Sequence, residues 1–452
     1  MTDIADQSVS TAAATTGRSL LQRGEHAKRR AASETRFRML GLVAVMIGIL
    51  AVVGLLASIL SNGVSSFFQT YVTVDIYLNP AKLDKTGNRD PEALQKVTTF
   101  AYAPLISAAV EKLIETHGIE IEGLKPKDAA KIISKEAPAS VRNYVLAHPS
   151  KIGETVKFDL LADGRVDGYY KGRVTMDSAK LDRNISPERL ELADKLKHAG
   201  VLKTRFNWSF FTAPDASDTR PEAAGLGVAI LGSAYMMIIV LVLSLPLGVA
   251  ASIYLEEFAV QNFFTDIIEV NIANLAAVPS IVFGILGLAI FINFAGLPQS
   301  APIVGGLVLT LMTLPTIIIA TRAALKAVPP SIREAALGVG ASKMQATFHH
   351  VLPLAMPGIL TGTIIGLAQA LGETAPLLLI GMVAFVREFP GAPPEGFFDP
   401  ASALPVQVYN WTTRGDPAFV ERASGAIIVL LVFLIIMNGL AIMLRRRFER
   451  RW

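Results

Sequence analysis

The chain has 452 residues, of which 52% are hydrophobic and only 18% are charged, and its mean hydropathy is +0.45. A chain this apolar and this poor in charge is not an average soluble protein, so the composition favours membrane insertion. The absence of cysteine excludes disulfides and thiolate metal sites.

Both ends of the chain are basic. Seven Lys and Arg lie between Arg18 and Arg38, and five Arg follow Leu444. The positive-inside rule keeps such ends in the cytoplasm, so we expect a cytoplasmic tail at 1–38 and a cytoplasmic C-terminus at 445–452. The N-terminal tail can contact anionic lipid headgroups of the bilayer. We expect no nucleic acid partner.

The first membrane span is predicted at 39–60, where 22 residues carry no charge. Roughly 20 apolar residues are needed to cross the hydrocarbon core of a bilayer. The run is too long, and begins too far from the N-terminus, for an ordinary cleaved signal peptide. It is therefore interpreted as a retained anchor.

Residues 61–224 have the charge density of a soluble protein. Apolar alternation at 72–78 predicts a half-buried strand, and helical periodicity follows at 91–118. The stretch 157–174 is interpreted as a hairpin with turns at Gly164 and Gly168. We therefore expect an inserted α+β domain that is large enough to hold its own core, and that is periplasmic if the first span runs outward.

Five further spans are predicted, which makes six in all. They fall on apolar runs at 227–255, in the two halves of the charge-free stretch 270–321, at 355–384 and at 424–444. The turn-like sequence LPQSAP separates the two halves, which are expected to form an antiparallel pair. Six crossings from a cytoplasmic N-terminus return the C-terminus to the cytoplasm, in agreement with the charge bias.

The predicted fold class is an all-α polytopic membrane protein of six transmembrane helices with an inserted α+β periplasmic domain. The transmembrane domain is expected at 225–444, and the loop 322–354 is expected to be cytoplasmic. This loop carries two helix-start signals, because Ser331 with Glu334, and Ser342 with Gln345, each match the S-x-x-E/Q capping box.

The rest of the loop suggests two short helices joined by a turn. Gly338 and Gly340 can supply the left-handed backbone that closes the first helix, and Pro353 is expected to end the second. Small Ala335 and Ala336 are expected on a face that another protein can approach closely. An ordinary capped loop between two spans is the alternative.

The pattern E-A-A-x-x-x-G, followed twelve residues later by Leu-Pro, resembles the coupling loop of permease subunits in binding-protein-dependent, type I ATP-binding-cassette importers. In that family the loop docks on a cytoplasmic ATPase. His350 stands where an aliphatic residue is usual. The resemblance implies a coupling role for Ser331, Glu334, Ala335, Ala336, Gly340, Leu352 and Pro353.

The chain has no Gly-Lys dipeptide and hence no phosphate-binding P-loop. If transport is driven by ATP, a separate ATPase must bind the ATP and Mg. We therefore expect this chain to be no enzyme and to hold no cofactor or metal of its own.

Glu373 is the only ionisable residue within the six predicted spans. A carboxylate at membrane depth costs about 3 kcal/mol on insertion scales, so it usually lines a pathway or meets a partner. Its surroundings, G-E-T-A-P-L, resemble the A-type subunit of phosphate-specific transport permeases, and so do VPSIVFGILGLAIF at 278–291 and LPVQVYNW at 404–411.

The resemblance covers about 206–444 and implies that about 71–204 is an insertion. It also implies a translocation pathway along Gln369, Glu373, Thr374, Pro279 and Ser280. Members of the family often have Arg where this chain has Gln369, so the charge that attracts phosphate is expected elsewhere. The alternative is that Glu373 is solvated near the outer mouth or caps the helix break made by Gly372 and Pro376.

The most consistent interpretation is a bacterial inner-membrane permease for inorganic phosphate that works by alternating access. The implied partners are a homologous C-type permease subunit, two copies of a cytoplasmic ATPase and a periplasmic phosphate-binding protein. A membrane-anchored receptor or sensor with a periplasmic ligand domain is the alternative. A membrane enzyme would need several catalytic groups at membrane depth, where only Glu373 is predicted.

Overall fold

The computed structural model describes residues 25–84, 87–382 and 385–448, and the chain divides into two units, 1–58 and 59–452. Helix α1 (Glu25–Gly63) contains the span predicted at 39–60. Its apolar window has no residue buried within the protein. Most of the predicted cytoplasmic tail, and the last four residues of the chain, lie outside the described residues.

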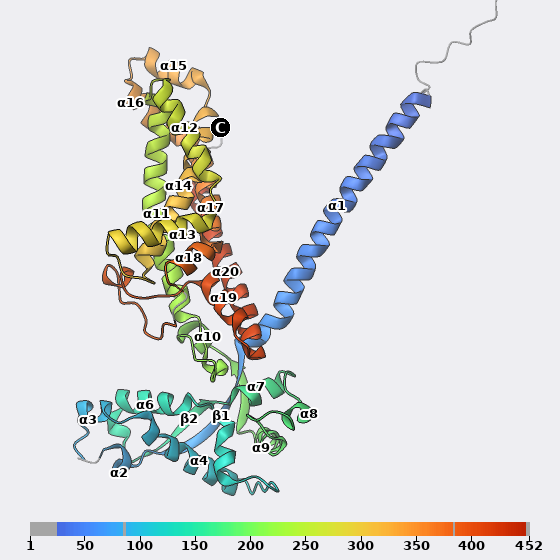
Figure 1. The fold of residues 1–452 in the computed structure, drawn as a ribbon, viewed down its shortest axis with the longest axis vertical. Helices are drawn as coiled ribbons and strands as arrows, with labels where there is room; N and C mark the ends of the chain where they lie inside the picture. Colours follow the sequence, from blue (N-terminus) through green and yellow to red (C-terminus); the bar gives the residue numbers. More distant parts are fainter. Residues whose placement is uncertain (1–24, 85–86, 383–384, 449–452) are drawn as a thin grey trace, which may run out of the picture. The chain divides into compact units, whose positions relative to one another are not determined.

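The second unit carries the other membrane-spanning helices (Figure 1). Counting α1, the described residues hold five helices that are long and apolar enough to cross a membrane, or six if one bent pair counts as a span. In the second unit these are α11 (Gly227–Ile253), the bent pair α12 (Phe263–Ala276) and α13 (Ser280–Gly287), α14 (Pro302–Lys326), α17 (Leu352–Gly372) and α20 (Pro417–Phe448).

Helix α14 lies between α11 and α17 and packs against both. Small residues allow the close approach of α17: a Cβ added to Gly362 would lie only 2.2 Å from the Cβ of Ala320 on α14. Membrane helices associate through such close packing, since lipid supplies no hydrophobic drive between them. The three helices therefore form the centre of the membrane region.

A three-stranded antiparallel sheet forms the core of the segment between α1 and α11. The strands are β1 (Phe68–Tyr77), β2 (Thr155–Leu161) and β3 (Leu202–Phe206), in the order β2-β1-β3. Val72, Val74 and Ile76 are buried in alternation, which confirms the strand predicted at 72–78. We call residues 68–206 the sheet region.

Helices cover the sheet. They are α2 (Pro80–Leu83), α3 (Pro91–Gln95), α4 (Ala103–Thr116), α5 (Pro126–Ala129), α6 (Ala137–Ala147), α7 (Gly164–Tyr170), α8 (Met176–Ala179) and α9 (Pro187–His198), and α10 (Ser209–Thr212) follows β3. The hairpin predicted at 157–174 is wrong. Strand β2 pairs with β1, with Phe158 opposite Val74. The Asp163 side chain then accepts a hydrogen bond from the Arg165 amide and starts helix α7, as an N-cap does.

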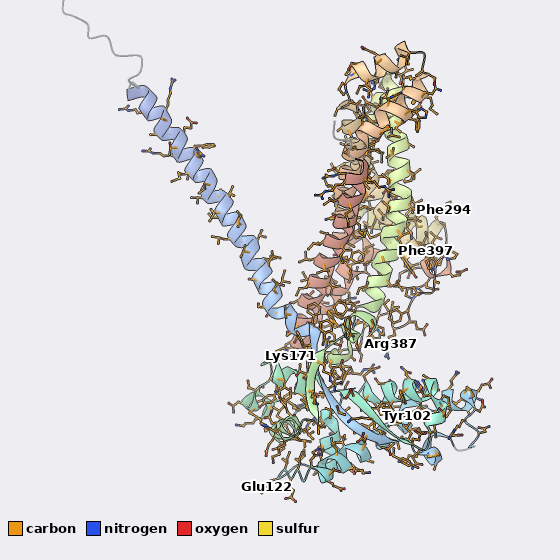
Figure 2. The ribbon with its side chains drawn as sticks, turned by 180° about the vertical axis from the view of Figure 1, so that it is seen from behind. Tyr102, Glu122, Lys171, Phe294, Arg387 and Phe397 are labelled. Carbon is orange, nitrogen blue, oxygen red and sulfur yellow. The ribbon has the colours of Figure 1, made fainter. Side chains whose placement is uncertain are left out.

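A buried cluster of charges joins the sheet region to α20. Lys171 Nζ lies 2.8 Å from Asp167 Oδ2 and 2.9 Å from Glu421 Oε1, and all three side chains are at most 9% exposed. Arg173 Nε lies 2.8 Å from Glu421 Oε2, although its N–H is not aligned for a hydrogen bond. Figure 2 shows Lys171 where the sheet region meets the membrane helices.

A second buried carboxylate lies just before α11. Glu222 in the short helix η5 (Pro221–Ala223) is 5% exposed and accepts a hydrogen bond from Ser134 Oγ. Burial, and to a smaller extent nearby Asp163, raise the pKa of Glu222 from 4.5 to about 7, although Ser134 and Arg422 oppose the shift. Glu222 therefore binds its proton more tightly in the folded than in the unfolded chain.

We expect the thermal stability of the protein to fall as the pH rises from about 4.5 to about 7, because the folded state must then lose a proton that it binds more tightly. The full effect is about 3 kcal/mol above pH 7. Glu222→Gln keeps the acceptor for Ser134 but cannot ionise, so its unfolding midpoint should depend less on pH. Melting curves of both proteins in detergent between pH 4.5 and 8.5 test this. Parallel curves would show that Glu222 is not the titrating group.

Candidate functional site

Glu373 lies at a break between two helices. Helix α17 ends at Gly372 and α18 (Ala375–Leu379) follows after two residues, because Pro376 has no amide to donate and its ring would clash with the carbonyl of residue 372. Glu373 itself has an extended backbone, with φ −76° and ψ 132°. Their spacing of four residues would place Gln369 and Glu373 on one face of an unbroken helix, but the helix stops between them, so they do not share a helix face.

A second break lies in the preceding membrane segment. Helices α12 and α13 are bent by 102° relative to each other, and Pro279 is the N-cap residue that precedes Ser280. The predicted antiparallel pair within 270–321 is thus a bent segment followed by the straight α14. This bend was not predicted, because an uninterrupted apolar sequence shows where a span lies but not how its helix is divided.

The two breaks are brought together in the fold, since α13 packs against α18. A Cβ added to Gly284 on α13 would lie 2.7 Å from Pro376 Cα, so the two backbones are in direct contact. Non-helical backbone at membrane depth is tolerated where protein covers it or where it lines a water-filled cavity. The residues predicted for the pathway, Pro279, Ser280, Gln369, Glu373 and Thr374, all lie at or near these two breaks.

The polar side chains at this place are only partly covered by the chain itself. Glu373 and Thr374 are half-buried, and Gln369 is exposed. Among the described residues, the Glu373 carboxylate makes no hydrogen bond or ion pair, and α18 has no side-chain cap. The alternative in which this carboxylate caps the helix break is therefore not seen.

The loop 322–354 lies at the end of the second unit far from the sheet region (Figure 1). It holds α15 (Pro330–Gly338) and α16 (Lys343–Ala346). The Ser342–Gln345 capping box is confirmed, and Gly340 has the left-handed backbone expected, with φ +89°. Gly338 instead belongs to α15, so the first helix is closed by Gly340 alone.

Three expectations for this loop are wrong. The Ser331–Glu334 box does not form, because α15 begins at Pro330, two residues too early for Ser331 to be its N-cap, and Pro329 takes that position. Ala336 is buried within the chain, whereas Ala335 and Glu334 are exposed. Pro353 does not end the second helix, since a π-turn (Thr347–Val351) carries α16 directly into α17, with Leu352 and Pro353 in its first turn.

The exposed surface of the loop carries large apolar side chains, and not only the small alanines expected from the sequence. The side chains of Leu337, Val339, Met344 and Phe348 are between 43% and 87% exposed. Exposed apolar groups gathered in one loop are typical of a protein interaction site. Their residue types gave no specific signal in the sequence.

Sequence reasoning also missed the side chain that holds α15 in place. Arg333 Nη2 lies 2.7 Å from Glu257 Oε1, and its guanidinium donates to the carbonyl groups of Leu325 and Val328. Glu257 is 7% exposed and follows α11. The available signal was a pair of Glu directly after an apolar span. The neighbouring Arg322 similarly bridges Glu256 and Glu269.

Comparison with known proteins places these features in a family. The model for "Binding-protein-dependent transport system inner membrane component" matches residues 244–452. "Phosphate transport system permease protein PstA 2" of Mycobacterium bovis is 34% identical over 251 residues, which cover 55% of this chain and 79% of that protein. The chain belongs to the PstA family of ABC importer permeases. It is accordingly a multi-pass inner-membrane protein.

Two further comparisons concern this permease. "Probable ABC transporter permease protein YqgI" of Bacillus subtilis is 33% identical over 227 residues, which cover 48% of this chain and 76% of that protein. An inward-facing structure of the MetNI methionine ABC transporter is similar at a TM-score of 0.38 and 16% identity, covering 50% of this chain and 95% of that one. The family model and the two sequence relatives do not favour the receptor alternative.

The rest of this permease matches a different model. "Domain of unknown function (DUF3333)" covers residues 24–180, which include α1 and most of the sheet region. The predicted domain boundaries and the roles of the predicted site residues stay predictions. Within the described residues, no group of three or more His, Asp or Glu is arranged to hold a metal ion.

Proposed function

We propose that this permease is the A-type transmembrane subunit of an ATP-driven phosphate importer and is not itself an enzyme. A homologous C-type subunit completes the translocation pathway, and a periplasmic phosphate-binding protein delivers the substrate. The half-exposed polar groups around Glu373 are then covered by the C-type subunit. Both termini are cytoplasmic, and the sheet region, as an inserted α+β domain, is periplasmic.

The observation that carries the proposal is the exposed apolar surface of α15 and α16, anchored to α11 by Arg333 and Glu257. A separate ATPase, two copies per transporter, binds ATP and Mg and docks on this surface. The absence of a P-loop sequence from the chain supports an external source of ATP hydrolysis. Movement of α16 is passed to α17, because the π-turn joins the two in one continuous helix.

Val339→Asp tests the docking, since Val339 is 87% exposed and its replacement leaves the fold unchanged. We expect phosphate uptake, and the amount of ATPase that co-purifies, to fall by about tenfold or more, because a charge in an apolar interface centre costs over about 1.4 kcal/mol. Leu181→Asp is the matched control, because Leu181 is an 89% exposed apolar residue of the sheet region. Equal uptake and co-purification for both variants would reject the docking surface.

A further inference from the structure

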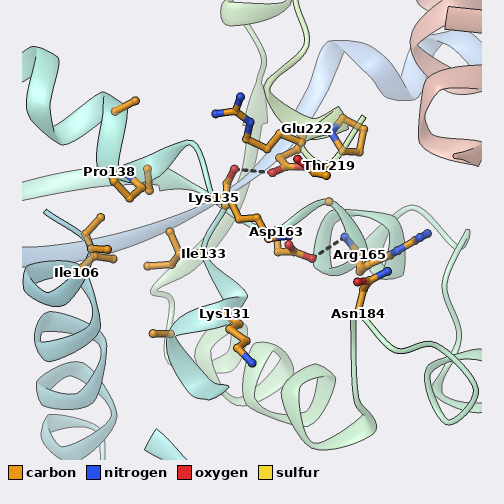
Figure 3. A pocket seen from close by; sticks show the side chains of 18 of the residues that line it. Ile106, Lys131, Ile133, Lys135, Pro138, Asp163, Arg165, Asn184, Thr219 and Glu222 are labelled. Carbon is orange, nitrogen blue, oxygen red and sulfur yellow. Dashed lines mark hydrogen bonds between the residues drawn. The ribbon is translucent and has the colours of Figure 1, made fainter. Parts of the chain in front are cut away.

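A cavity of about 770 Å³ lies where the sheet region meets the segments leading into α11 and α20. Figure 3 shows side chains from several elements around it, among them Lys135, Asp163, Arg165 and Glu222. The lining carries eight Lys or Arg against four Asp or Glu. A cavity with this charge balance favours an anionic occupant.

Half of these cations already have partners in the protein. Lys131 pairs with Asp128, Arg165 pairs with Asp182 and Asp416, and both Arg220 and Arg387 pair with Glu136. The other four make no hydrogen bond or ion pair through their side chains to any described residue. They are Lys127, Lys135, Arg183 and Arg189. Positive charge is thus left over at the cavity wall.

Arg189 is the most informative of the four. It lies in the first turn of α9, lines the cavity and is only 8% exposed as a whole residue, so most of its side chain is packed in the protein. Its charge acts to lower the pKa of the nearby Asp163 and Asp128 carboxyl groups, but no carboxylate of the described residues forms an ion pair with it. Largely buried arginines are normally paired in this way. The planar guanidinium is suited to bind two oxygens of a carboxylate or phosphate.

Two carboxylates on the same wall narrow the class of anion. Glu222 is held by Ser134 Oγ, and Asp163 by the Arg165 amide. In its ionised form, either carboxylate repels an oxyanion that has no proton, such as sulfate. A hydrogenphosphate or a protonated phosphate monoester can instead donate its proton to a carboxylate oxygen. Burial raises the pKa of both carboxyl groups, which fits an environment poor in water.

We propose that this cavity binds the phosphate group of a small ligand. Arg189 and the neighbouring unpaired cations hold the phosphate oxygens, and the carboxylate of Asp163 or Glu222 accepts a hydrogen bond from the phosphate hydroxyl. The volume exceeds that of inorganic phosphate, so the group is either free phosphate or part of a small organic ester. The proposal goes beyond transport and does not rest on it, because every residue in the argument lies outside the membrane helices that hold Glu373.

The test is calorimetric titration of the purified full-length protein at pH 7 in maltoside micelles, which carry no phosphate. The three probes are inorganic phosphate, glycerol 3-phosphate and sulfate. We expect at least one phosphate ligand to bind about tenfold or more tightly than sulfate, and Arg189→Gln to weaken that binding by about tenfold or more. Tighter binding of inorganic phosphate would identify the ligand as free phosphate, and tighter binding of glycerol 3-phosphate would identify it as an organic phosphate ester. Equal binding of sulfate, or no binding of either phosphate ligand, overturns the proposal.

Two controls separate this site from the transport pathway and from misfolding. Arg205→Gln removes an arginine of the sheet region that does not line the cavity, and Glu373→Gln alters the membrane site; both should bind as the wild type does. Lys135→Gln, at an exposed position, should also weaken binding without affecting the fold. Wild-type affinity in both Arg189→Gln and Lys135→Gln would overturn the proposal, whereas loss of binding in Glu373→Gln would assign it to the pathway.

Discussion

Glu421→Ala should destabilise the protein by about 3–5 kcal/mol, because it leaves Lys171 and Arg173 to share a single carboxylate, that of Asp167. Lys171 and Arg173 both bridge Glu421, and Asp167 is the other carboxylate in contact with them. The loss should appear as a lower unfolding midpoint in detergent. It should also appear as faster proteolysis of the sheet region, because this cluster attaches it to α20.

An exposed ion pair provides the control. Asp128→Ala breaks the pair with Lys131; the Asp128 and Lys131 side chains are 40% and 62% exposed, so the unfolding midpoint should stay almost unchanged. The double variant Lys171→Met, Glu421→Leu removes a positive and a negative charge together. It should recover part of the stability lost in Glu421→Ala, since neither member of this ion pair is left behind alone. If Glu421→Ala and Asp128→Ala unfolded at the same temperature, the buried charge cluster would not be what attaches the sheet region to α20.

Glu373→Gln should reduce phosphate uptake by about tenfold or more at matched expression, because the amide keeps the size of the side chain and loses its charge. Such a loss would mean that the charge acts in the pathway or in gating. The protein should still be inserted and should still co-purify with its ATPase, since Glu373 lies at the far end of α17 from the loop 322–354. Radioactive phosphate uptake in cells lacking other phosphate importers provides the measurement.

Glu388→Gln is the matched control for this experiment. Glu388 is an exposed carboxylate outside the membrane helices, and its neutralisation should leave uptake unchanged. Normal uptake in Glu373→Gln would mean that the carboxylate is simply solvated at the outer mouth. The break between α17 and α18 would remain in that case, because Pro376 causes it.

The membrane spans were predictable because length and apolarity are properties of a single segment. The predicted span 227–255 begins at the same residue as α11 and ends two residues after it, and the predicted first span lies inside α1. The bend between α12 and α13 was not predictable in this way. It depends on the packing of α13 against α18, a contact between residues about ninety positions apart in the chain.

Local start signals failed where a neighbouring residue competed with them. Ser331 has the right spacing to Glu334, but Pro330 already has a fixed backbone angle suited to the first helical position, and α15 begins there. Gly164 and Gly168 similarly suggested turns, yet the Asp163 cap starts a helix through both. The partnership of Arg333 with Glu257 joins two elements distant in sequence, and no local pattern contains it.

The continuity of α16, the π-turn and α17 has a mechanical consequence. Residues 343–372 form one rod of 30 residues, which is about 45 Å long at a rise of 1.5 Å per residue. Tilting such a lever by about 5° about its base would carry the opposite tip through about 4 Å, more than the diameter of a water molecule. A small rotation imposed on the helix at Lys343 would thus become a displacement of several ångströms beside Glu373.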